Sequence, residues 1–154
     1  MNTNILKEIC NIPSPSNVED KLIDYLVKKK FKYFTSKISR ANSVSFYTDT
    51  KKSKTLLLDA HIDQVHLRIL RIHKDGFIVV KSVGFGIETV IGNTVTHMDS
   101  GKIGIVGSLP PHLNIIDKPN QGRIGFVDFG LNKKESEKIF VPGDIILFEQ
   151  NYTK

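Results

Sequence analysis

The chain has 154 residues, 40% of them hydrophobic and 25% charged, and a formal net charge of +6 at pH 7. This length suits one ordinary domain or two small ones, with enough apolar side chains for a core. No apolar run approaches the roughly 20 residues of a membrane-spanning helix, and the N-terminus lacks the pattern of a signal peptide. Cys10 has no second cysteine to pair with, which fits a reducing compartment and a role as a small buried side chain. The composition therefore predicts a soluble, cytoplasmic protein without a membrane partner.

The excess positive charge lies in the first third of the chain. Residues 1–54 hold 11 Lys+Arg and 5 Asp+Glu, a net of +6, whereas residues 55–154 hold 11 of each, a net of zero. The densest stretch, KKKFKYF at Lys28–Phe34, mixes cations with aromatic rings, as surfaces that bind single-stranded nucleic acids do. Lysines at the end of a helix also complement the helix dipole, with Phe31 and Phe34 turned inward. We favour this second interpretation and expect no nucleic-acid partner.

Two short helices are predicted at the front of the chain. The first covers residues 2–10 and is ended by the prolines of NIPSPS. The second is predicted to begin at Ser16, because Ser16 and Glu19 have the spacing of a capping box. Its apolar stripe includes Leu22 and Leu26, which need a sheet to cover.

Two strands are predicted to supply that sheet. SVSFYTD, at residues 43–49, alternates between apolar and polar side chains. TLLLDA, at residues 55–60, is continuously apolar over Leu56–Leu58, as in a central strand that is buried on both faces. Together with the helices, these strands predict part of an α/β domain.

The sequence changes character after His66. Six short β-rich segments follow, separated by glycines, prolines and turn dipeptides: LRILRIH, FIVVKSV, NTVTHM, GKIGIVGS, GRIGFVDFG and GDIILFE. KDG at Lys74–Gly76 marks a hairpin, and LNKKESEK is a brief helix that Asn132 and Glu135 are predicted to cap. This pattern predicts a small barrel or sandwich over residues 67–147 rather than a series of βαβ units.

A possible metal ligand follows the apolar strand. In open α/β sheets, ligands bind beyond the carboxyl ends of the strands, and His61 of the stretch DAHID would lie at such an edge. A histidine nitrogen binds zinc well, and Asp63, two residues further on, can accept the other ring N–H. A His-x-Asp pair also arises as a satisfied polar pair at a strand end, so the spacing by itself leaves both interpretations open.

Four segments occur in an order that resembles a known family. They are NIPSPSNVEDKLIDYL, LLLDAHID, GKIGIVGSLPPHL and VDFGLNKKESEKIFVPGDIILF, within residues 6–148. The chain resembles the glutamyl and deblocking aminopeptidases with dinuclear metal centres, which include the tetrahedral aminopeptidases. The resemblance implies an α/β fold class, with the N-terminal part of a metallopeptidase catalytic domain at residues 1–66. A β-rich, barrel-like dimerisation domain at 67–147 and a return segment at 148–154 are implied to follow.

The same resemblance implies the site and its partners. His61 is the metal ligand, and Asp63 is the catalytic-site aspartate that orients it. The complete family uses two divalent metal ions, zinc or cobalt, to remove N-terminal residues from peptide substrates. A homo-oligomer formed through the β-rich domain is implied as well.

Much of the family's active site has no counterpart in these 154 residues. Family members are more than twice as long, and their second half carries a bridging aspartate, a glutamate pair, a further carboxylate and a distal histidine. Catalytic zinc needs about three protein ligands, so His61 by itself is not expected to hold a metal ion tightly. We expect the N-terminal fragment of a metal-dependent aminopeptidase that is inactive alone. The alternative is a non-catalytic oligomerisation module or truncated remnant.

The remaining histidines are weaker candidates. Gln64 and His66 stand where the family usually has a glutamate and a hydrophobic–glycine pair, and a hinge or surface role is favoured for His66 over metal binding. His73 and His97 precede hairpin turns, which favours structural roles. His112 follows two prolines, so we expect it to serve in loop packing or an interface rather than in catalysis.

Overall fold

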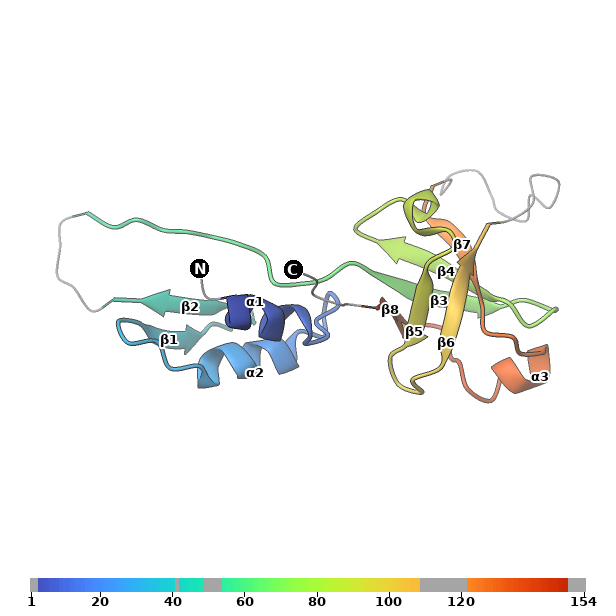
Figure 1. Cartoon of the computed structure of the whole chain (residues 1–154), viewed down its shortest axis with the longest axis horizontal. Coiled ribbons are helices and arrows are strands. Elements are labelled where there is room, and N and C mark those ends of the chain that lie inside the picture. The colour runs from blue at the N-terminus through green and yellow to red at the C-terminus, as the bar shows by residue number, and fades with distance from the viewer. Residues whose placement is uncertain (1–2, 41, 49–53, 109–121, 150–154) are drawn as a thin grey trace. The chain divides into compact units, whose positions relative to one another are not determined.

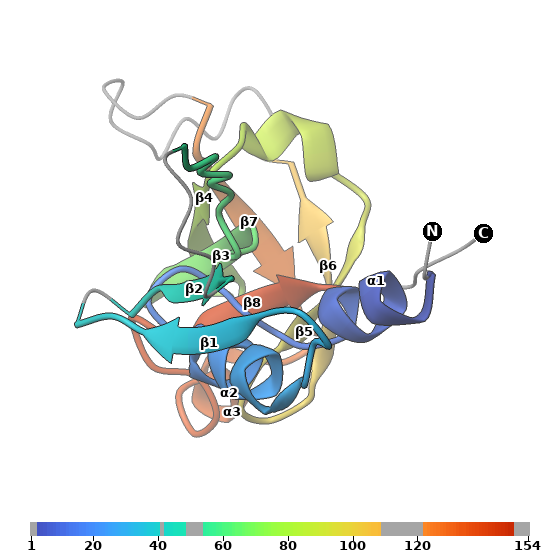
Figure 2. The ribbon, with the colours of Figure 1, turned by 90° about the vertical axis from the view of Figure 1, so that its left-hand side faces the viewer.

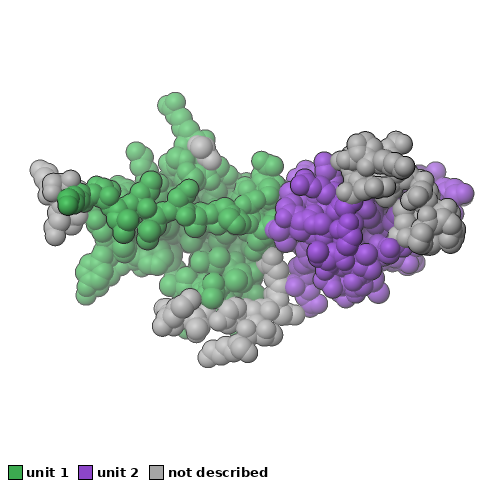
Figure 3. Space-filling view, turned by 90° about the horizontal axis from the view of Figure 1, so that it is seen from above, with its two compact units in different colours: residues 1–64, 152–154 green, residues 65–151 purple. Residues whose placement is uncertain are grey.

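The computed structural model of the chain describes residues 3–40, 42–48, 54–108 and 122–149. These residues form two compact units, one within residues 1–64 and the other within residues 65–151 (Figure 3). Among them, no helix is long and apolar enough to cross a membrane. The elements are α1 (Thr3–Cys10), α2 (Asp20–Lys28), β1 (Thr35–Ile38), β2 (Val44–Tyr47), β3 (His66–Ile72), β4 (Ile78–Val83), the 3-10 helix η1 (Ile87–Val90), β5 (Thr94–His97), β6 (Ile103–Gly107), β7 (Ile124–Asp128), α3 (Lys133–Ser136) and β8 (Ile145–Phe148).

The first unit contains α1, α2 and the antiparallel hairpin β1–β2. Helix α2 packs against both strands of the hairpin (Figure 2) and buries Leu22 and Ile23. The ring of Phe31 meets Phe46 of β2 edge to face, with centroids 5.2 Å apart. Both predicted helices and the strand predicted at residues 43–49 are confirmed. The helix stripe is covered by a two-stranded ribbon, which is smaller than the sheet we expected.

The predicted capping box at the start of the second helix is wrong. Helix α2 begins at Asp20, its N-cap is Glu19, and no side chain bonds to the cap. The carboxylate of Glu19 instead accepts a hydrogen bond from the backbone N–H of Asn17 at 2.8 Å. Asn17 has a φ of +72°, in the left-handed region, so the chain turns between Ser16 and the helix. The Ser16 hydroxyl is thereby directed elsewhere, to Asp63.

The predicted central strand at residues 55–60 is also wrong for this chain by itself. Residues 54–63 carry no strand, and Leu56, Leu57 and Leu58 are 83–85% exposed. In Figure 1 this stretch is the long green trace that follows β2. A strand must pair its N–H and C=O groups with a neighbour, and the described hairpin β1–β2 pairs only with itself. The apolar pattern therefore indicated a segment suited to burial, without the neighbour that burial requires.

Three smaller features of the first unit differ from expectation. Phe31 is half-buried, but Phe34 is 51% exposed, so only one of the two rings turns inward. Cys10 is half-buried rather than fully buried. Strand β1 was not predicted, because TSKI contains only one large apolar side chain and gains its partner β2 through the turn that follows.

The second unit is a closed antiparallel barrel. Its described strands follow the order β3-β4-β7-β6-β5-β8, and β8 pairs with β3 to close the ring (Figure 1). The six predicted β-rich segments each supply one strand, which confirms the barrel and the mixed helix and strand composition of the chain. The buried cluster of this unit consists of Leu67, Ile69, Ile78, Val80, Ile87, Val95, Val106, Val127, Phe140 and Ile146.

Two turns of the barrel form as the sequence predicts. Gly76 has a φ of +97° in the hairpin between β3 and β4, and a Cβ at this position would lie 2.1 Å from the carbonyl oxygen of Leu131. Glycine is therefore required both by the backbone conformation and by the close approach of another segment. The capping box of α3 is confirmed, since the side chain of Asn132 accepts from the backbone of Glu135 and the Glu135 side chain accepts from the backbone of Asn132.

Candidate functional site

His61 and Asp63 lie two residues apart, and their side chains meet. The His61 Nδ1 atom is 3.0 Å from Oδ1 of Asp63 and 3.1 Å from the backbone oxygen of Asp63. Both oxygens can only accept, so Nδ1 carries a proton and donates it. In the neutral ring the lone pair is then on Nε2, and the side chain is 86% exposed. His61 therefore presents a nitrogen suited to metal binding at the surface of its unit.

The Asp63 carboxylate is held from its other side by Ser16. The Ser16 hydroxyl donates a hydrogen bond to Oδ2, while Oδ1 accepts from the His61 ring. The Ser16 hydroxyl makes the largest contribution to holding the pKa of Asp63 below its usual value of 3.8; burial opposes this lowering, and the His61 ring adds to it. Asp63 is therefore an anionic acceptor between a hydroxyl and an imidazole.

The backbone beneath this pair is fixed by a contact between two distant segments. Ser14 is fully buried, and its hydroxyl donates to the carbonyl oxygen of Ile62 at 3.0 Å. The Ser14 N–H donates to the side-chain oxygen of Gln64 at 3.1 Å, and the Gln64 N–H donates to the Ser14 carbonyl at 2.8 Å. Pro15 and Gln64 form an isolated parallel bridge. The segments around Ser14 and Ile62 are therefore locked side by side.

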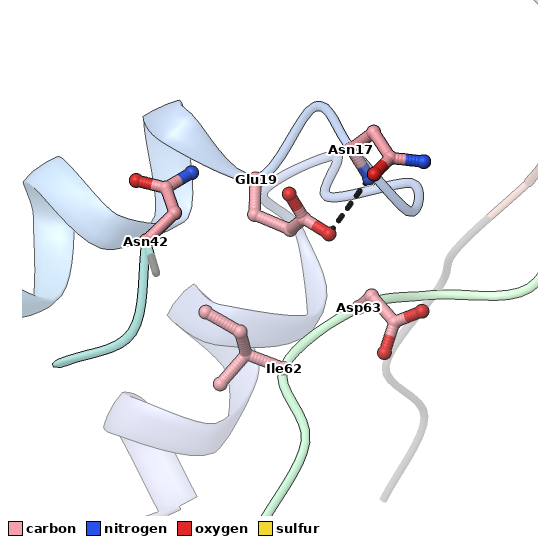
Figure 4. Close-up of a pocket in the computed structure, with 5 residues that line it drawn as sticks. All are labelled: Asn17, Glu19, Asn42, Ile62 and Asp63. Carbon is pink, nitrogen blue, oxygen red and sulfur yellow. Dashed lines mark hydrogen bonds between the residues drawn. The ribbon is translucent and has the colours of Figure 1, made fainter. Parts of the chain in front are cut away.

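Asp63 also borders a pocket of about 340 Å³ (Figure 4). The other lining residues are Asn17, Glu19, Asn42 and Ile62. Figure 4 shows Glu19 bonded to the backbone of Asn17 on one side of the pocket and Asp63 on another. With two carboxylates and two amide side chains, the lining is polar and acidic. Asp63 thus belongs both to the pocket wall and to the pair with His61.

Two other histidine–aspartate pairs show why spacing does not identify a metal ligand. His73 and Asp75 repeat the His-x-Asp spacing with an Nδ1 to Oδ2 distance of 3.2 Å, but the His73 side chain is only 14% exposed. His97 lies 3.2 Å from Asp144, and its side chain is 2% exposed. Exposure therefore distinguishes His61 from both.

The barrel contains a cluster of His97, Asp99 and Asp144, whose potential ligand atoms all lie within 4.8 Å of one another. Both nitrogens of His97 are already used: Nδ1 accepts from the backbone N–H of Ser100 at 3.2 Å, and Nε2 lies 3.2 Å from Asp144. Asp144 also accepts from the backbone N–H of Val141 at 2.7 Å. These bonds tie a hairpin to a turn, which agrees with the structural role expected for His97. In the described ranges, no comparable cluster includes His61.

The other residues singled out in the sequence lie at positions that differ in burial and in hydrogen bonding. His66 is fully buried as the first residue of β3, so the expectation of a surface position is wrong. It lies one residue after the start of the second unit, which is where the hinge was expected. Gln64 takes part in the lock with Ser14. His112 and the surrounding PPHL lie outside the described residues. The contact that sequence analysis missed is the hydrogen bond from Ser16 to Asp63, because the capping-box spacing assigned Ser16 to the helix instead.

Comparison with known proteins shows what the chain is similar to. Residues 42–154 match the family described as M42 glutamyl aminopeptidase. The chain is 30% identical over 161 residues to the lysyl aminopeptidase of Pyrococcus furiosus, covering 97% of this chain and 46% of that protein. A solved aminopeptidase from the archaeon Desulfurococcus kamchatkensis has 27% identity and a TM-score of 0.72, covering 95% of this chain and 42% of that one.

A further solved structure, the TET1 peptidase of Pyrococcus horikoshii, has 21% identity and a TM-score of 0.70 and supports the fold alone. The match covers 98% of this chain and 47% of that one, and the TET1 peptidase can assemble into a tetrahedron or a large octahedral shell. The chain spans about half the length of the relatives it matches.

Proposed function

Because this chain belongs to the M42 glutamyl aminopeptidase family, we propose that it forms the first part of a metal-dependent aminopeptidase in which His61 binds a divalent metal ion. The observation that carries the proposal is the contact of His61 Nδ1 with two oxygens of Asp63, which favours a proton on Nδ1 and leaves Nε2 as a metal-binding nitrogen on an exposed ring. Asp63 positions that ring. In the completed site, further ligands come from the part of the relatives' length that this chain does not span, and two ions, zinc or cobalt, are bound.

The division of labour within the proposed site follows from general metal chemistry. A bound zinc ion lowers the pKa of a water molecule and polarises a peptide carbonyl, which is the chemistry that peptide hydrolysis needs. His61 contributes one neutral nitrogen ligand through Nε2. Asp63 keeps the proton on Nδ1 and the ring in one direction. The substrates are peptides with a free N-terminus, in keeping with the family.

We further propose that the chain is cytoplasmic and forms a homo-oligomer through the barrel. Strand β6 alternates buried and exposed residues, and its outward side chains Ile103 and Ile105 are 65% and 56% exposed. Neighbouring exposed apolar side chains favour association. Light scattering at tens of micromolar, roughly where weak interfaces remain formed, should show an oligomer that Ile105→Lys dissociates. A clean wild-type monomer would contradict this proposal.

A second candidate function is a non-catalytic oligomerisation module, as the sequence already suggested. The barrel is closed by its own strands, whereas the first unit contributes a single proposed metal ligand. Under either function, the chain alone should show no aminopeptidase activity with zinc or cobalt. Turnover of aminoacyl substrates that disappears in His61→Ala would contradict the expectation of an incomplete site.

The decisive experiment supplies, from a relative, the part of the family's length that this chain does not span. A C-terminal segment of a family member, mixed with this chain, should bind zinc with an affinity that His61→Ala lowers strongly. Asp63→Asn should weaken it by about 10- to 100-fold, the range for partners that orient a metal ligand. His73→Ala is the matched control, because His73 has the same spacing and a similar contact to an aspartate. If His61→Ala and His73→Ala leave zinc binding equally unchanged, the proposed metal site is wrong.

A further inference from the structure

The direction of the His61 ring depends on very few contacts. Its side chain is 86% exposed, so packing contributes little to its orientation. By contrast, the ring of His97 packs edge to face against Phe140, with centroids 5.0 Å apart, and is almost fully buried. The contacts that the structure shows for the His61 ring are those from Nδ1 to Asp63. The orientation of His61 is therefore only as well defined as that of the Asp63 carboxylate.

The Asp63 carboxylate is in turn fixed by Ser16. One carboxylate oxygen accepts from the Ser16 hydroxyl and the other accepts from His61, so rotation of the carboxylate would break both bonds. The backbone that leads to Ser16 is held in place, because Ser14, two residues earlier, is buried and hydrogen-bonded to Ile62. Nor is the Ser16 hydroxyl needed by helix α2, which begins at Asp20 without a side-chain cap.

We propose that Ser16 is a positioning residue, which fixes the Asp63 carboxylate and, through it, keeps the His61 proton on Nδ1 and the Nε2 lone pair aimed outward. Ser16, Asp63 and His61 then act as a chain of two hydrogen bonds that starts at the locked backbone and ends at the exposed nitrogen. The functional value of this positioning rests on the proposed binding of a metal ion by His61. Its geometry is a property of the metal-free chain and can be tested there.

The test compares the tautomer of His61 in full-length variants without metal. Long-range ¹H–¹⁵N spectra at pH 8 distinguish Nδ1–H from Nε2–H rings. The wild-type His61 should be mainly in the Nδ1–H form. Ser16→Ala should shift it toward the Nε2–H form that exposed histidines prefer, whereas Ser16→Thr, which keeps the hydroxyl, should restore the wild-type signal. Ser45→Ala, an exposed serine on β2 in the same unit, is the matched control and should change nothing.

A double-mutant comparison shows whether Ser16 acts through Asp63. Asp63→Asn should shift the tautomer in the same direction as Ser16→Ala, and adding Ser16→Ala to Asp63→Asn should have little further effect. An unchanged His61 signal in Ser16→Ala would overturn the proposal. So would loss of the amide pattern of the first unit in that variant, since it would give Ser16 a general role in folding. Because no metal is present, failure here leaves the zinc test of His61 untouched, and failure of the zinc test leaves this result standing.

Discussion

The two units of this chain differ in how fully each pairs its own backbone. Every described strand of the barrel has a neighbour on both sides, and nearly all the buried hydrophobic side chains lie in this unit. Among the described residues of the first unit, only Leu22 and Ile23 are buried hydrophobic side chains, and three consecutive leucines are exposed. The barrel is therefore stabilised mainly by its closed hydrophobic core. The first unit, which carries the candidate site, combines a much smaller apolar core with a set of specific hydrogen bonds.

Hydrogen exchange on the full chain is the most direct test of this difference between the two units. Amides of β4, paired on both sides, should exchange only through unfolding of the barrel, while amides of residues 54–60 should exchange nearly as in an unfolded chain. We expect rates that differ by orders of magnitude. Equal protection of the two segments would mean that residues 54–60 do have a strand partner, and it would count against the proposed incomplete domain.

The same substitution in each unit should have very different costs. Leu67 is fully buried in the barrel, so Leu67→Ala should lower the free energy of unfolding by about 2–5 kcal/mol. Leu57 is 85% exposed, so Leu57→Ala should change it by no more than about 0.5 kcal/mol. Denaturant titration of both variants measures the difference. A large cost at Leu57 would show that the leucine run is buried in solution.

Two glycines of the barrel separate the cost of backbone strain from the cost of a steric clash. Gly76→Ala combines a positive φ, which costs about 1–2 kcal/mol, with a clash against Leu131, which costs about 1–3 kcal/mol more. Gly101 also has a positive φ, of +69°, but a Cβ there would meet nothing within 4 Å, so Gly101→Ala should cost only about 1–2 kcal/mol. Thermal unfolding of the two variants separates the clash from the backbone strain. Equal effects would show that the contact with Leu131 is easily relieved.

The smallest expected effect is the pH dependence of the first unit. Lys29, and then Tyr25, lower the pKa of Glu8 below its usual value of 4.5 through hydrogen bonds. A lowered pKa in the folded state stabilises the fold above the usual pKa, and this contribution is lost as the pH falls through the folded pKa. Glu8→Gln should therefore remove part of the acid sensitivity that the first unit shows by circular dichroism or NMR. The acid sensitivity that remains in Glu8→Gln should come from Asp63, whose pKa is lowered as well.

If Glu8→Gln leaves the acid transition of the first unit unchanged, the contact with Lys29 does not contribute to stability. Both partners are partly exposed, and exposed ion pairs are weak. The matched comparison is Glu137→Gln at the C-cap of α3, where the partner Lys133 is 3.5 Å away on the surface of the barrel. That change should leave the acid stability of the barrel nearly unaltered, because the buried core dominates it.

Most of the barrel was predictable from the sequence. Short β-rich segments separated by turn residues identified its strands, and Asn132 and Glu135 identified the capping box of α3. These features are local: a turn, a cap or an alternating strand depends on residues close together in sequence. Every described strand of the barrel also finds both of its pairing partners within the same unit. Its hydrophobic pattern and its final structure therefore agree.

The spacing of His61 and Asp63 was visible in the sequence, as was the family resemblance, but His73 and Asp75 show that such spacing also arises in a turn. Only the tertiary structure decided which ring is exposed, which ring nitrogen faces the Asp63 oxygens and which residue holds Asp63. Ser16 lies 47 residues before Asp63, and a hydrogen bond between such distant positions leaves no periodic trace in the sequence. Likewise, the run Leu56–Leu58 has the apolar sequence of a buried strand. It is exposed because the described part of its unit offers no neighbouring strand to pair with it.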